Sequence, residues 1–392
     1  MLLNLEIDKV EIQICARCIY DERVDAIHFD AQGICNYCRN VEYLIDQYGT
    51  GQSKGVIQFA KICEDIKRAG RGNKYDCVVG VSGGTDSSYL VYLAKKKWGL
   101  KPLAVHYDNT WNSANATMNI KKVLGALNID LCTHVVENKE SDDIFRSFFL
   151  AGVAEIEAAT DLGFAFLLRK VAAKHSIKYI LEGHSFVAEG ITPLGRNYFD
   201  GRYIKSIHNK FGMHKMATYP LMTLTRFLSS AIIDQVKFIR PFWYLNYSKE
   251  EAKIFLEQNL GWKYYGGHHL ENRMSAFYHG IYLPQKFGTD MRNNTLSALV
   301  RNGILTRSEA WAKYNSPPVI EEGLVNYFKK RLNLSDQEYN HIMKSFPKNW
   351  TEYPTYKKYF EVLRPLFYLL AKENLVTMSF YLKYCSPSKI SA

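Results

Sequence analysis

Short apolar runs and helical spacing of apolar residues alternate along the middle of the chain. Runs rich in Val, Ile and Leu are typical of buried parallel strands, and they occupy residues 76–81, 102–107, 130–136, 179–181 and 238–241. Apolar residues at helical spacing predict helices between them, over residues 88–96, 115–127 and 142–174. Strands that alternate with helices predict an α/β fold with a doubly wound parallel sheet.

The C-terminal part of the chain has a different pattern. Ser248 and Glu251 have the spacing of a capping box and predict a helix that continues to about Asn259. Residues 264–295 mix Gly, His, Asn and Arg with short apolar pieces, which we interpret as a functional loop region rather than core. Helical spacing returns from residue 295 onward, so the C-terminal region is expected to be mostly helical.

A glycine-rich turn, Ser82-Gly83-Gly84-Thr85-Asp86-Ser87, joins the first expected strand to the first expected helix. Such a turn presents backbone N–H groups and the positive end of the helix dipole, which together form a cradle for phosphate. It is not a Walker A loop, because the chain contains no Gly-Lys-Ser/Thr triplet. The alternative is an ordinary turn rich in Ser and Gly.

Polar residues also follow the ends of two further expected strands. In an open parallel sheet, ligands bind outside the carboxyl ends of the strands. Residues 82–88, 106–109 and 182–184 are therefore expected to converge on one site.

Four of the eight cysteines, Cys15, Cys18, Cys35 and Cys38, have the spacing C-x2-C-x16-C-x2-C. This spacing favours one structural zinc ion held by four thiolates. Residues 26–29 and 30–33 are expected to form a strand and a turn that bring the two pairs together. A redox pair or an iron–sulfur site is the alternative. The other four cysteines are expected to be buried, inert thiols.

Composition narrows the class of protein. The 392 residues carry a net charge of +11, which is spread without a block of like charges and suits nucleotides as well as RNA. No apolar run is long enough to span a membrane, and residues 1–8 have no signal-peptide pattern. A cytoplasmic protein is therefore expected.

The order Ser-Gly-Gly-x-Asp-Ser resembles the PP-loop of the ATP pyrophosphatases, which cleave ATP between its α and β phosphates. The cysteine quartet, this loop and residues 283–292 together resemble the N-acetyl-sugar amidotransferase family of PP-loop ATPases (WbpG-like and PseA-like proteins). Residues 108–113, 264–269 and 304–310 match as well. His268, Asn272 and Met291 depart from the family pattern, and residues 320–392 match no pattern known to us.

The resemblance implies three regions and a reaction. The regions are a zinc-binding module with a linker helix (1–72), a PP-loop ATP pyrophosphatase domain (73–245), and a substrate loop with a helical region (246–392). In the implied reaction the acetamido group of a nucleotide sugar becomes an acetamidino group, in lipopolysaccharide O-antigen or flagellin-sugar biosynthesis. ATP activates the amide oxygen and leaves as AMP and pyrophosphate, and ammonia displaces AMP.

The strand ends and the resemblance together indicate the site residues. The expected ATP-binding residues are Ser82, Gly83, Gly84, Thr85, Asp86, Ser87, Ser88, His106, Tyr107, Asp108 and Gly183. Catalytic roles are expected for Asp86, as a ligand of Mg²⁺, and for Ser87, Glu182 and Lys286. Substrate contacts are expected from Asn109, Trp111, His268, His269, Lys286 and Arg292.

Several of these residues have plainer alternatives. Lys286 and Arg292 could belong to a solvated basic face, and His268 and His269 could lie at the surface. Glu182 could act as a general base or could orient the loop.

Glutamine cannot be the direct nitrogen source in this interpretation. No cysteine follows Met1 directly and none lies in a Gly-x-Cys-x-Gly elbow, so the chain lacks both usual glutaminase signatures. The resemblance implies partners similar to the glutaminase and cyclase subunits of histidine biosynthesis. The rival functions are a tRNA-thiolating PP-loop enzyme with a zinc module and a non-enzymatic nucleotide-binding scaffold.

Overall fold

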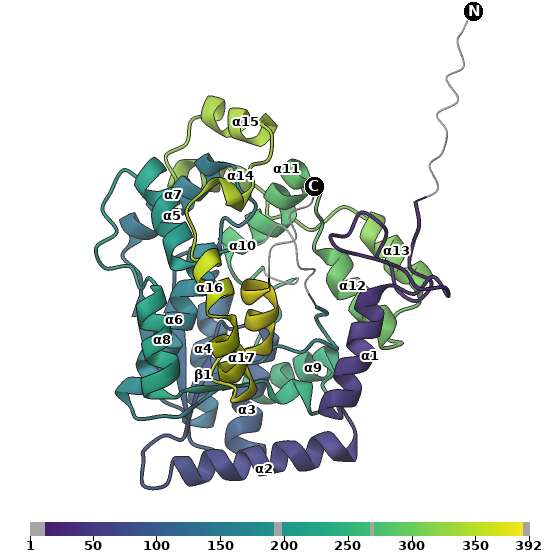
Figure 1. Ribbon diagram of the computed structural model, residues 1–392, viewed down its shortest axis with the longest axis vertical. Helices are drawn as coiled ribbons and strands as arrows, with labels where there is room; N and C mark the ends of the chain where they lie inside the picture. The colour runs from purple at the N-terminus through teal and green to yellow at the C-terminus, as the bar shows by residue number, and fades with distance from the viewer. Residues whose placement is uncertain (1–11, 192–197, 267–269, 387–392) are drawn as a thin grey trace, which may run out of the picture.

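A five-stranded parallel sheet forms the centre of the molecule in the computed structural model, which describes residues 12–191, 198–266 and 270–386 (Figure 1). The strand order is β3-β2-β1-β4-β5. The strands are β1 (Cys77–Gly80), β2 (Pro102–Asp108), β3 (Leu131–Val135), β4 (Tyr179–Leu181) and β5 (Lys237–Ile239). The predicted doubly wound α/β fold is confirmed, because β1 in the middle pairs in parallel with both β2 and β4.

Helices connect the strands on both faces of the sheet. They are α3 (Thr85–Tyr92), α4 (Ala114–Leu127), α5 (Asn138–Ala151), α6 (Ala158–Lys174), α7 (Gly201–Phe211) and α8 (Leu224–Ser229). Successive residues of β1 point to opposite faces, so Val78 is buried in the core cluster that includes α5, α6 and α7, and Val79 in the one that includes α3 and α4. Both faces are therefore covered, which explains why the strands are apolar runs rather than alternating patterns.

The N-terminal region contains α1 (Asn36–Tyr48) and α2 (Ser53–Ala69). The strand expected at residues 26–29 does not form; this stretch contributes one isolated bridge, between Phe29 and Cys35. The expected turn is present, with Gly33 at a positive φ of 72°. Figure 1 shows the cysteine-containing segment and α1 beside α12 and α13 of the C-terminal region.

The C-terminal region is helical, as expected. Its helices are α9 (Lys249–Leu260), α10 (Arg273–Phe277), α11 (Leu283–Phe287), α12 (Arg292–Arg301), α13 (Arg307–Asn315), α14 (Leu324–Arg331), α15 (Asp336–Lys344), α16 (Lys357–Val362), α17 (Arg364–Lys372) and α18 (Met378–Phe380). Ser248 caps α9 by accepting a hydrogen bond from the Glu251 N–H at 3.3 Å. Within the described ranges, no helix is long and apolar enough to cross a bilayer.

The interpretation of residues 264–295 as a loop region is wrong for most of the described part. This stretch contains α10, α11 and the start of α12, and its Met274, Phe277 and Tyr282 belong to the larger core cluster. The Phe277 ring stacks on Phe328 of α14 with 3.6 Å between centroids. The polar residues of the stretch obscured its helical spacing, since its apolar residues are few and the helices are short.

Phe277→Ala is expected to lower the free energy of unfolding by about 3–5 kcal/mol, because a fully buried aromatic ring leaves a cavity. Phe346→Ala is the matched control, since that ring is 92% exposed, and its effect should stay within about 0.5 kcal/mol. Urea denaturation of both variants provides the measurement. Equal stability of the two variants would contradict a core role for α10.

Candidate functional site

The glycine-rich turn between β1 and α3 is held by its backbone. Gly83 has a φ of 83°, and a Cβ at this position would lie 2.3 Å from the Ala116 carbonyl oxygen of α4, so only glycine fits. The Gly83 carbonyl accepts a hydrogen bond from the Trp262 indole N–H at 2.9 Å. Gly84 precedes α3 without a side-chain cap. The first turn of α3 therefore begins with backbone N–H groups that a phosphate could accept from.

Two serines form hydrogen bonds within this turn. The Ser82 N–H donates to the Ser87 hydroxyl at 3.3 Å, and the Gly84 N–H donates to the Ser82 hydroxyl at 3.3 Å. Thr85 and Ser88 are buried in the same turn of helix. Ser82, Gly84 and Ser87 line a cavity, so a ligand in it could reach this turn, and the phosphate cradle stays a prediction.

Asp86 lies at the start of α3, but protein groups already occupy its carboxylate. Its Oδ1 accepts a hydrogen bond from the Tyr247 hydroxyl, and its Oδ2 lies 2.7 Å from the Lys249 Nζ. Burial opposes the charge of Lys249, yet Asp86 and Glu189 outweigh burial and raise the pKa of the lysine. Binding of Mg²⁺ at Asp86 therefore requires exchange of Lys249 for the metal ion.

Lys249 was not expected from the sequence. The sequence showed it only as the residue after the expected cap Ser248, and its ion pair with a residue 163 positions away was not visible.

The end of β4 lies directly against the start of α3. A Cβ on Gly183 would lie 3.2 Å from the Asp86 carbonyl carbon, so the glycine permits this approach. Glu182 accepts a hydrogen bond from the Arg240 Nε at 2.9 Å, which makes it part of an ion pair. Burial and the positive charge of Arg240 lower the pKa of His184 to about 3, so its ring stays neutral. The His184 Nδ1 accepts a hydrogen bond from the Trp243 indole at 3.1 Å.

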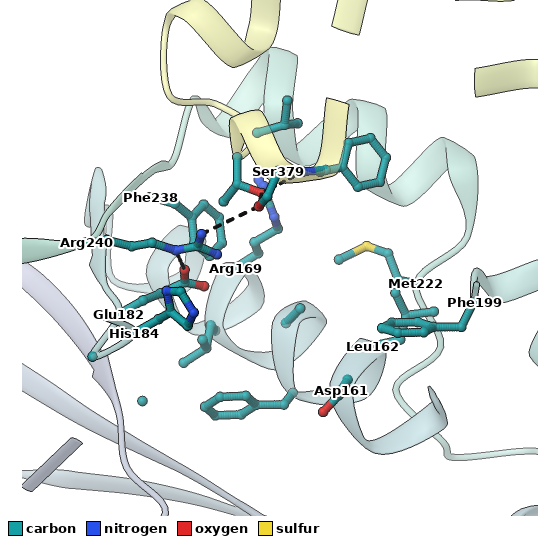
Figure 2. A pocket seen from close by; sticks show the side chains of 18 of the residues that line it. Asp161, Leu162, Arg169, Glu182, His184, Phe199, Met222, Phe238, Arg240 and Ser379 are labelled. Carbon is teal, nitrogen blue, oxygen red and sulfur yellow. Dashed lines mark hydrogen bonds and ion pairs between the residues drawn. The ribbon is translucent and has the colours of Figure 1, made fainter. Parts of the chain in front are cut away.

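Two neighbouring cavities open at this end of the sheet. The first chamber, of about 720 Å³, is lined by the glycine-rich turn (residues 82–87), the end of β4, α6 and the C-terminal helices. The second chamber, of about 740 Å³, is lined by the ends of β1 and β2 and by residues of α10 and α12. Described residues that line both chambers are Ser82, Asp161, Phe164, His184, Glu189, Phe199, Glu271 and Lys383. Figure 2 shows the first chamber, with Glu182 and His184 at one side and Phe199 and Met222 at the other.

The end of β2 contributes to the second chamber as the strand pattern predicted. His106 lines it, and its Nδ1 donates to the Val81 carbonyl oxygen at 2.9 Å. Tyr107 and Asn109 also line it, although the Tyr107 hydroxyl donates to Tyr219 at 2.8 Å. Asp108 lines neither chamber among the described residues; its carboxylate accepts from the Thr110 N–H at 2.7 Å. Asp108 therefore stabilises the turn, and its contact with ATP stays a prediction.

Trp111 is a core residue rather than a substrate contact. It is 1% exposed, and its indole N–H donates to Asp142 at 2.8 Å. The Arg331 guanidinium lies over its ring at 4.1 Å. The expected substrate role is corrected, because the side chain points into the packing between α5 and α14 and lines neither chamber.

Lys286 is also placed differently from the expectation. It is 7% exposed, and its ammonium donates to the Ile342 carbonyl, to the Ser345 carbonyl at 2.8 Å and to the Ser345 hydroxyl at 3.0 Å. These acceptors lie at the C-terminal end of α15, where helix carbonyls have no partner of their own. Both its catalytic and its substrate role are therefore corrected to a structural one.

Arg292 reaches the second chamber, but its guanidinium is bound within the protein. It pairs with Asp290 at 2.6 Å and donates to the Ser316 carbonyl at 2.7 Å and the Tyr314 carbonyl at 3.0 Å. Its main role is thus to fix the end of α13. His268 and His269 lie outside the described residues.

The four cysteines of the N-terminal segment form one buried cluster. Their sulfur atoms all lie within 4.8 Å of one another, with 3.8 Å between Cys15 and Cys38 and 3.9 Å between Cys18 and Cys35. Hydrogen bonds from the other three thiols lower the pKa of Cys15. A metal ion could be held by this set, as the spacing predicted.

Two arginines of the C-terminal region contact this cluster. The Arg301 Nε lies 3.2 Å from the Cys38 sulfur and one of its terminal nitrogens 3.4 Å from the Cys18 sulfur. Arg307 donates to the Cys15 carbonyl at 2.8 Å. A guanidinium beside thiolates offsets their negative charge, so the cluster and α12 stabilise each other.

The remaining cysteines do not approach the chambers. Cys63, Cys77 and Cys385 are buried, and Cys132 is partly buried in β3. Burial raises the pKa of Cys63 to about 11 and of Cys385 to about 12, so these thiols stay protonated near neutral pH.

Residues 271–366 match the family model of the LPS biosynthesis protein WbpG-like, C-terminal domain. An uncharacterized protein of Methanocaldococcus jannaschii is 24% identical over 319 residues, which cover 79% of this chain and 95% of that protein.

Similar solved structures include NMN synthetase from Francisella tularensis, with a TM-score of 0.35 and 12% identity over 72% of this chain and 94% of that one. NH3-dependent NAD synthetase from Campylobacter jejuni has a TM-score of 0.31 and 13% identity over 73% and 94% of the two chains. The U34-tRNA thiolase NcsA from Methanococcus maripaludis, with its 4Fe–4S cluster, has a TM-score of 0.31 and 12% identity over 78% and 92%.

Lys286→Met is expected to lower the free energy of unfolding by about 1–3 kcal/mol, because buried carbonyls at the end of α15 lose their donor. Binding of ATP should not change, since Lys286 lines neither chamber. The exposed Lys344 of the same helix, changed to Met, is the control. Loss of ATP affinity without loss of stability would restore the original assignment.

Proposed function

We propose that the chain is an ATP-dependent amidotransferase, because its residues 271–366 match the model of the WbpG-like C-terminal domain. The match includes residues 320–366, for which the sequence pattern gave no resemblance, and it corrects that expectation. Its substrate is an acetamido sugar carried on a nucleotide, and its product is the acetamidino sugar of a surface polysaccharide or flagellin. The carrying observation is that the glycine-rich turn and the WbpG-like domain line the same second chamber, through Ser82 on one side and Asn272, Ser275 and Tyr278 on the other.

The proposed chemistry has two steps. The amide oxygen of the acetamido group attacks the α-phosphorus of ATP, and the bond to the β-phosphate breaks, so that pyrophosphate leaves. Ammonia then attacks the imidate carbon, AMP departs with the former amide oxygen, and loss of one proton leaves the amidine as its amidinium cation. An amide needs this activation, because its oxygen is a very poor leaving group until it carries a phosphoryl group.

The residues of the turn suit the first step. Charge develops on the departing pyrophosphate, and the free N–H groups at the start of α3 would stabilise it without reorganisation. The Ser82 and Ser87 hydroxyls are further donors at the same turn. Mg²⁺ would neutralise part of the phosphate charge when bound, with Asp86 as the proposed ligand after release from Lys249.

Neutral His184 and the paired Glu182 lie beside this turn. We assign them positioning roles, because the Glu182 carboxylate is engaged by Arg240 and the His184 ring by Trp243. His106 and Tyr107 remain the proposed contacts for the nucleoside of ATP.

Ammonia is proposed to come from a separate glutaminase. No described residue that lines either chamber is a cysteine, so no thiol nucleophile for glutamine hydrolysis faces the site. The same observation disfavours tRNA thiolation, which generally uses reactive cysteines at the ATP site.

The cysteine cluster is proposed to hold one structural zinc ion. Four thiolates suit tetrahedral zinc, and a Zn(Cys)4 centre keeps a negative charge that Arg301 would offset. An iron–sulfur cluster is the alternative that the four cysteines leave open.

The reaction is tested by incubating the protein with ATP, ammonium and UDP- or CMP-linked acetamido sugars at alkaline pH. We expect AMP and pyrophosphate in equal amounts and, by mass spectrometry, replacement of one oxygen by NH in the sugar. Glutamine in place of ammonium should give no product. Asp86→Ala should lower turnover by about 100-fold or more. ADP as the product would exclude the PP-loop chemistry. In a parallel incubation with tRNA and a sulfur donor, formation of thiolated tRNA would favour the rival function instead.

Metal analysis of the purified protein is expected to find one zinc per chain. Cys18→Ser should lose the metal and lower the melting temperature, because metal binding is coupled to folding of such a module. Cys63→Ser is the matched control, since Cys63 lies outside the cluster. Iron with acid-labile sulfide in the wild-type protein would identify the site as an iron–sulfur cluster instead.

A further inference from the structure

The last described turn of the chain lies at the candidate site. Residues Tyr381–Cys385 form a π-helical turn that continues α18. Lys383 in this turn lines both chambers, together with Ser82 of the glycine-rich turn. This segment follows the WbpG-like domain, which ends at residue 366.

The sheet domain holds this segment in place with two arginines. Arg169 of α6, which is 5% exposed, donates to the Leu375 carbonyl at 2.9 Å. Arg240, which follows β5, contacts the Ser379 hydroxyl at 3.5 Å as well as Glu182 (Figure 2). A buried guanidinium loses much hydration, and burial lowers the pKa of Arg169 to about 10. One guanidinium therefore holds the backbone at Leu375 and the other contacts the Ser379 side chain, both ahead of Lys383.

Contacts from the C-terminal helices complete the support. The Lys357 ammonium donates to the Tyr384 carbonyl at 2.9 Å, and the Tyr384 ring stacks on Phe380 at 4.8 Å between centroids. Tyr384 and Cys385 are buried in the cluster that these helices form. Lys383 thus projects from a supported turn rather than from a loose end.

The other described cations at the chambers already have partners or lie in solvent. Lys249 pairs with Asp86, Arg240 with Glu182 and Arg292 with Asp290. Arg169 donates to Ser230 and Leu375, and Lys313 is exposed.

Lys383 differs from these cations. No hydrogen bond or ion pair to another described residue holds its ammonium, which lies 5.3 Å from the Phe199 ring and 5.4 Å from the Tyr384 ring. Burial lowers its pKa, and the attraction of Glu155 and Asp161 opposes that effect. Burial also raises the pKa of Glu155 to about 7, so this carboxyl is partly protonated near neutral pH and neutralises Lys383 incompletely.

We propose that Lys383 is a substrate-binding residue whose ammonium binds a phosphate oxygen of a nucleotide at the junction of the two chambers. The phosphate belongs either to ATP or to the nucleotide sugar, since the ammonium borders both chambers. The C-terminal segment would then complete a site that the sheet and the WbpG-like domain begin. This inference rests on the proposed function, since both ATP and the nucleotide sugar are substrates in that proposal.

The test is calorimetric binding of two probes, α,β-methylene-ATP with Mg²⁺ and UDP-N-acetylglucosamine, to the full chain. Lys383→Met is expected to weaken one or both probes by about 10- to 100-fold, the range for a hydrogen bond to a charged group. Lys383→Arg should recover most of the affinity. Lys372→Met, on the exposed face of α17 in the same segment, should leave both affinities unchanged. The probe that weakens identifies the source of the phosphate.

A structural role for Lys383 gives a different result. If the lysine only balances Glu155 and Asp161, Lys383→Met lowers the melting temperature and leaves both dissociation constants unchanged, which would overturn the proposal. Lys383→Gln, which keeps a polar end, serves if the Met variant does not fold. Binding is measured without turnover, so failure of the sugar reaction appears separately, as absence of amidine with the wild-type protein.

Discussion

The hydrogen bond from the Trp262 indole to the Gly83 carbonyl fixes the turn on which the rest of the site depends. Gly83 can accept it only because its backbone adopts a positive φ and lies against α4 without a Cβ. The Gly83 carbonyl points toward Trp262, and Gly83 itself packs against α4. The N–H groups that follow Gly83 belong to the first turn of α3, which lies at the first chamber. Trp262 is fully buried, so the contact joins the C-terminal half of the chain to the glycine-rich turn. A shift of the segment that follows α9 would therefore move the glycine-rich turn as well.

A similar dependence ties the N-terminal module to the C-terminal region. Four cysteine sulfurs packed within 4.8 Å gather negative charge when they bind a metal, and Arg301 of α12 lies where it can offset that charge. Tyr20, beneath the same guanidinium, donates to Asn294, which lines the second chamber. The cluster is therefore linked to the chamber by a short chain of contacts through Arg301, Tyr20 and Asn294. This path explains how a metal distant from the chemistry could still stabilise the shape of the site.

The sequence predicted the features that depend on local pattern. The five strands of the sheet and the cysteine cluster follow from apolar runs and cysteine spacing, and they were found where the pattern placed them. The first helix after the glycine-rich turn starts earlier than expected, at Thr85 rather than Ser88, and the strand expected at residues 26–29 does not form. Predictions from residue type alone were less successful. Lys286 and Trp111 belong to residue types that often bind ligands. In the folded chain, however, Lys286 donates to carbonyls at the end of a helix, and the Trp111 ring is buried in the core. Lys249 and Lys383 could not be found from the sequence, because their importance depends on partners more than a hundred residues away.

Two ion pairs between protein side chains lie at the candidate site. Asp86 is paired with Lys249 and Glu182 with Arg240, and both pairs are partly buried. Each pair keeps charges compensated while no nucleotide is bound, since an unpaired charge in such surroundings is costly. A triphosphate with Mg²⁺ carries both signs of charge. Its oxygens could pair with Lys249 while its metal ion pairs with Asp86, so that both residues would keep a charged partner. A nucleotide without the metal would draw Lys249 away and leave the Asp86 carboxylate with the Tyr247 hydroxyl but without a cation. In the proposed function, the pair between Asp86 and Lys249 would therefore favour the metal complex of ATP over the free nucleotide before any chemical step begins.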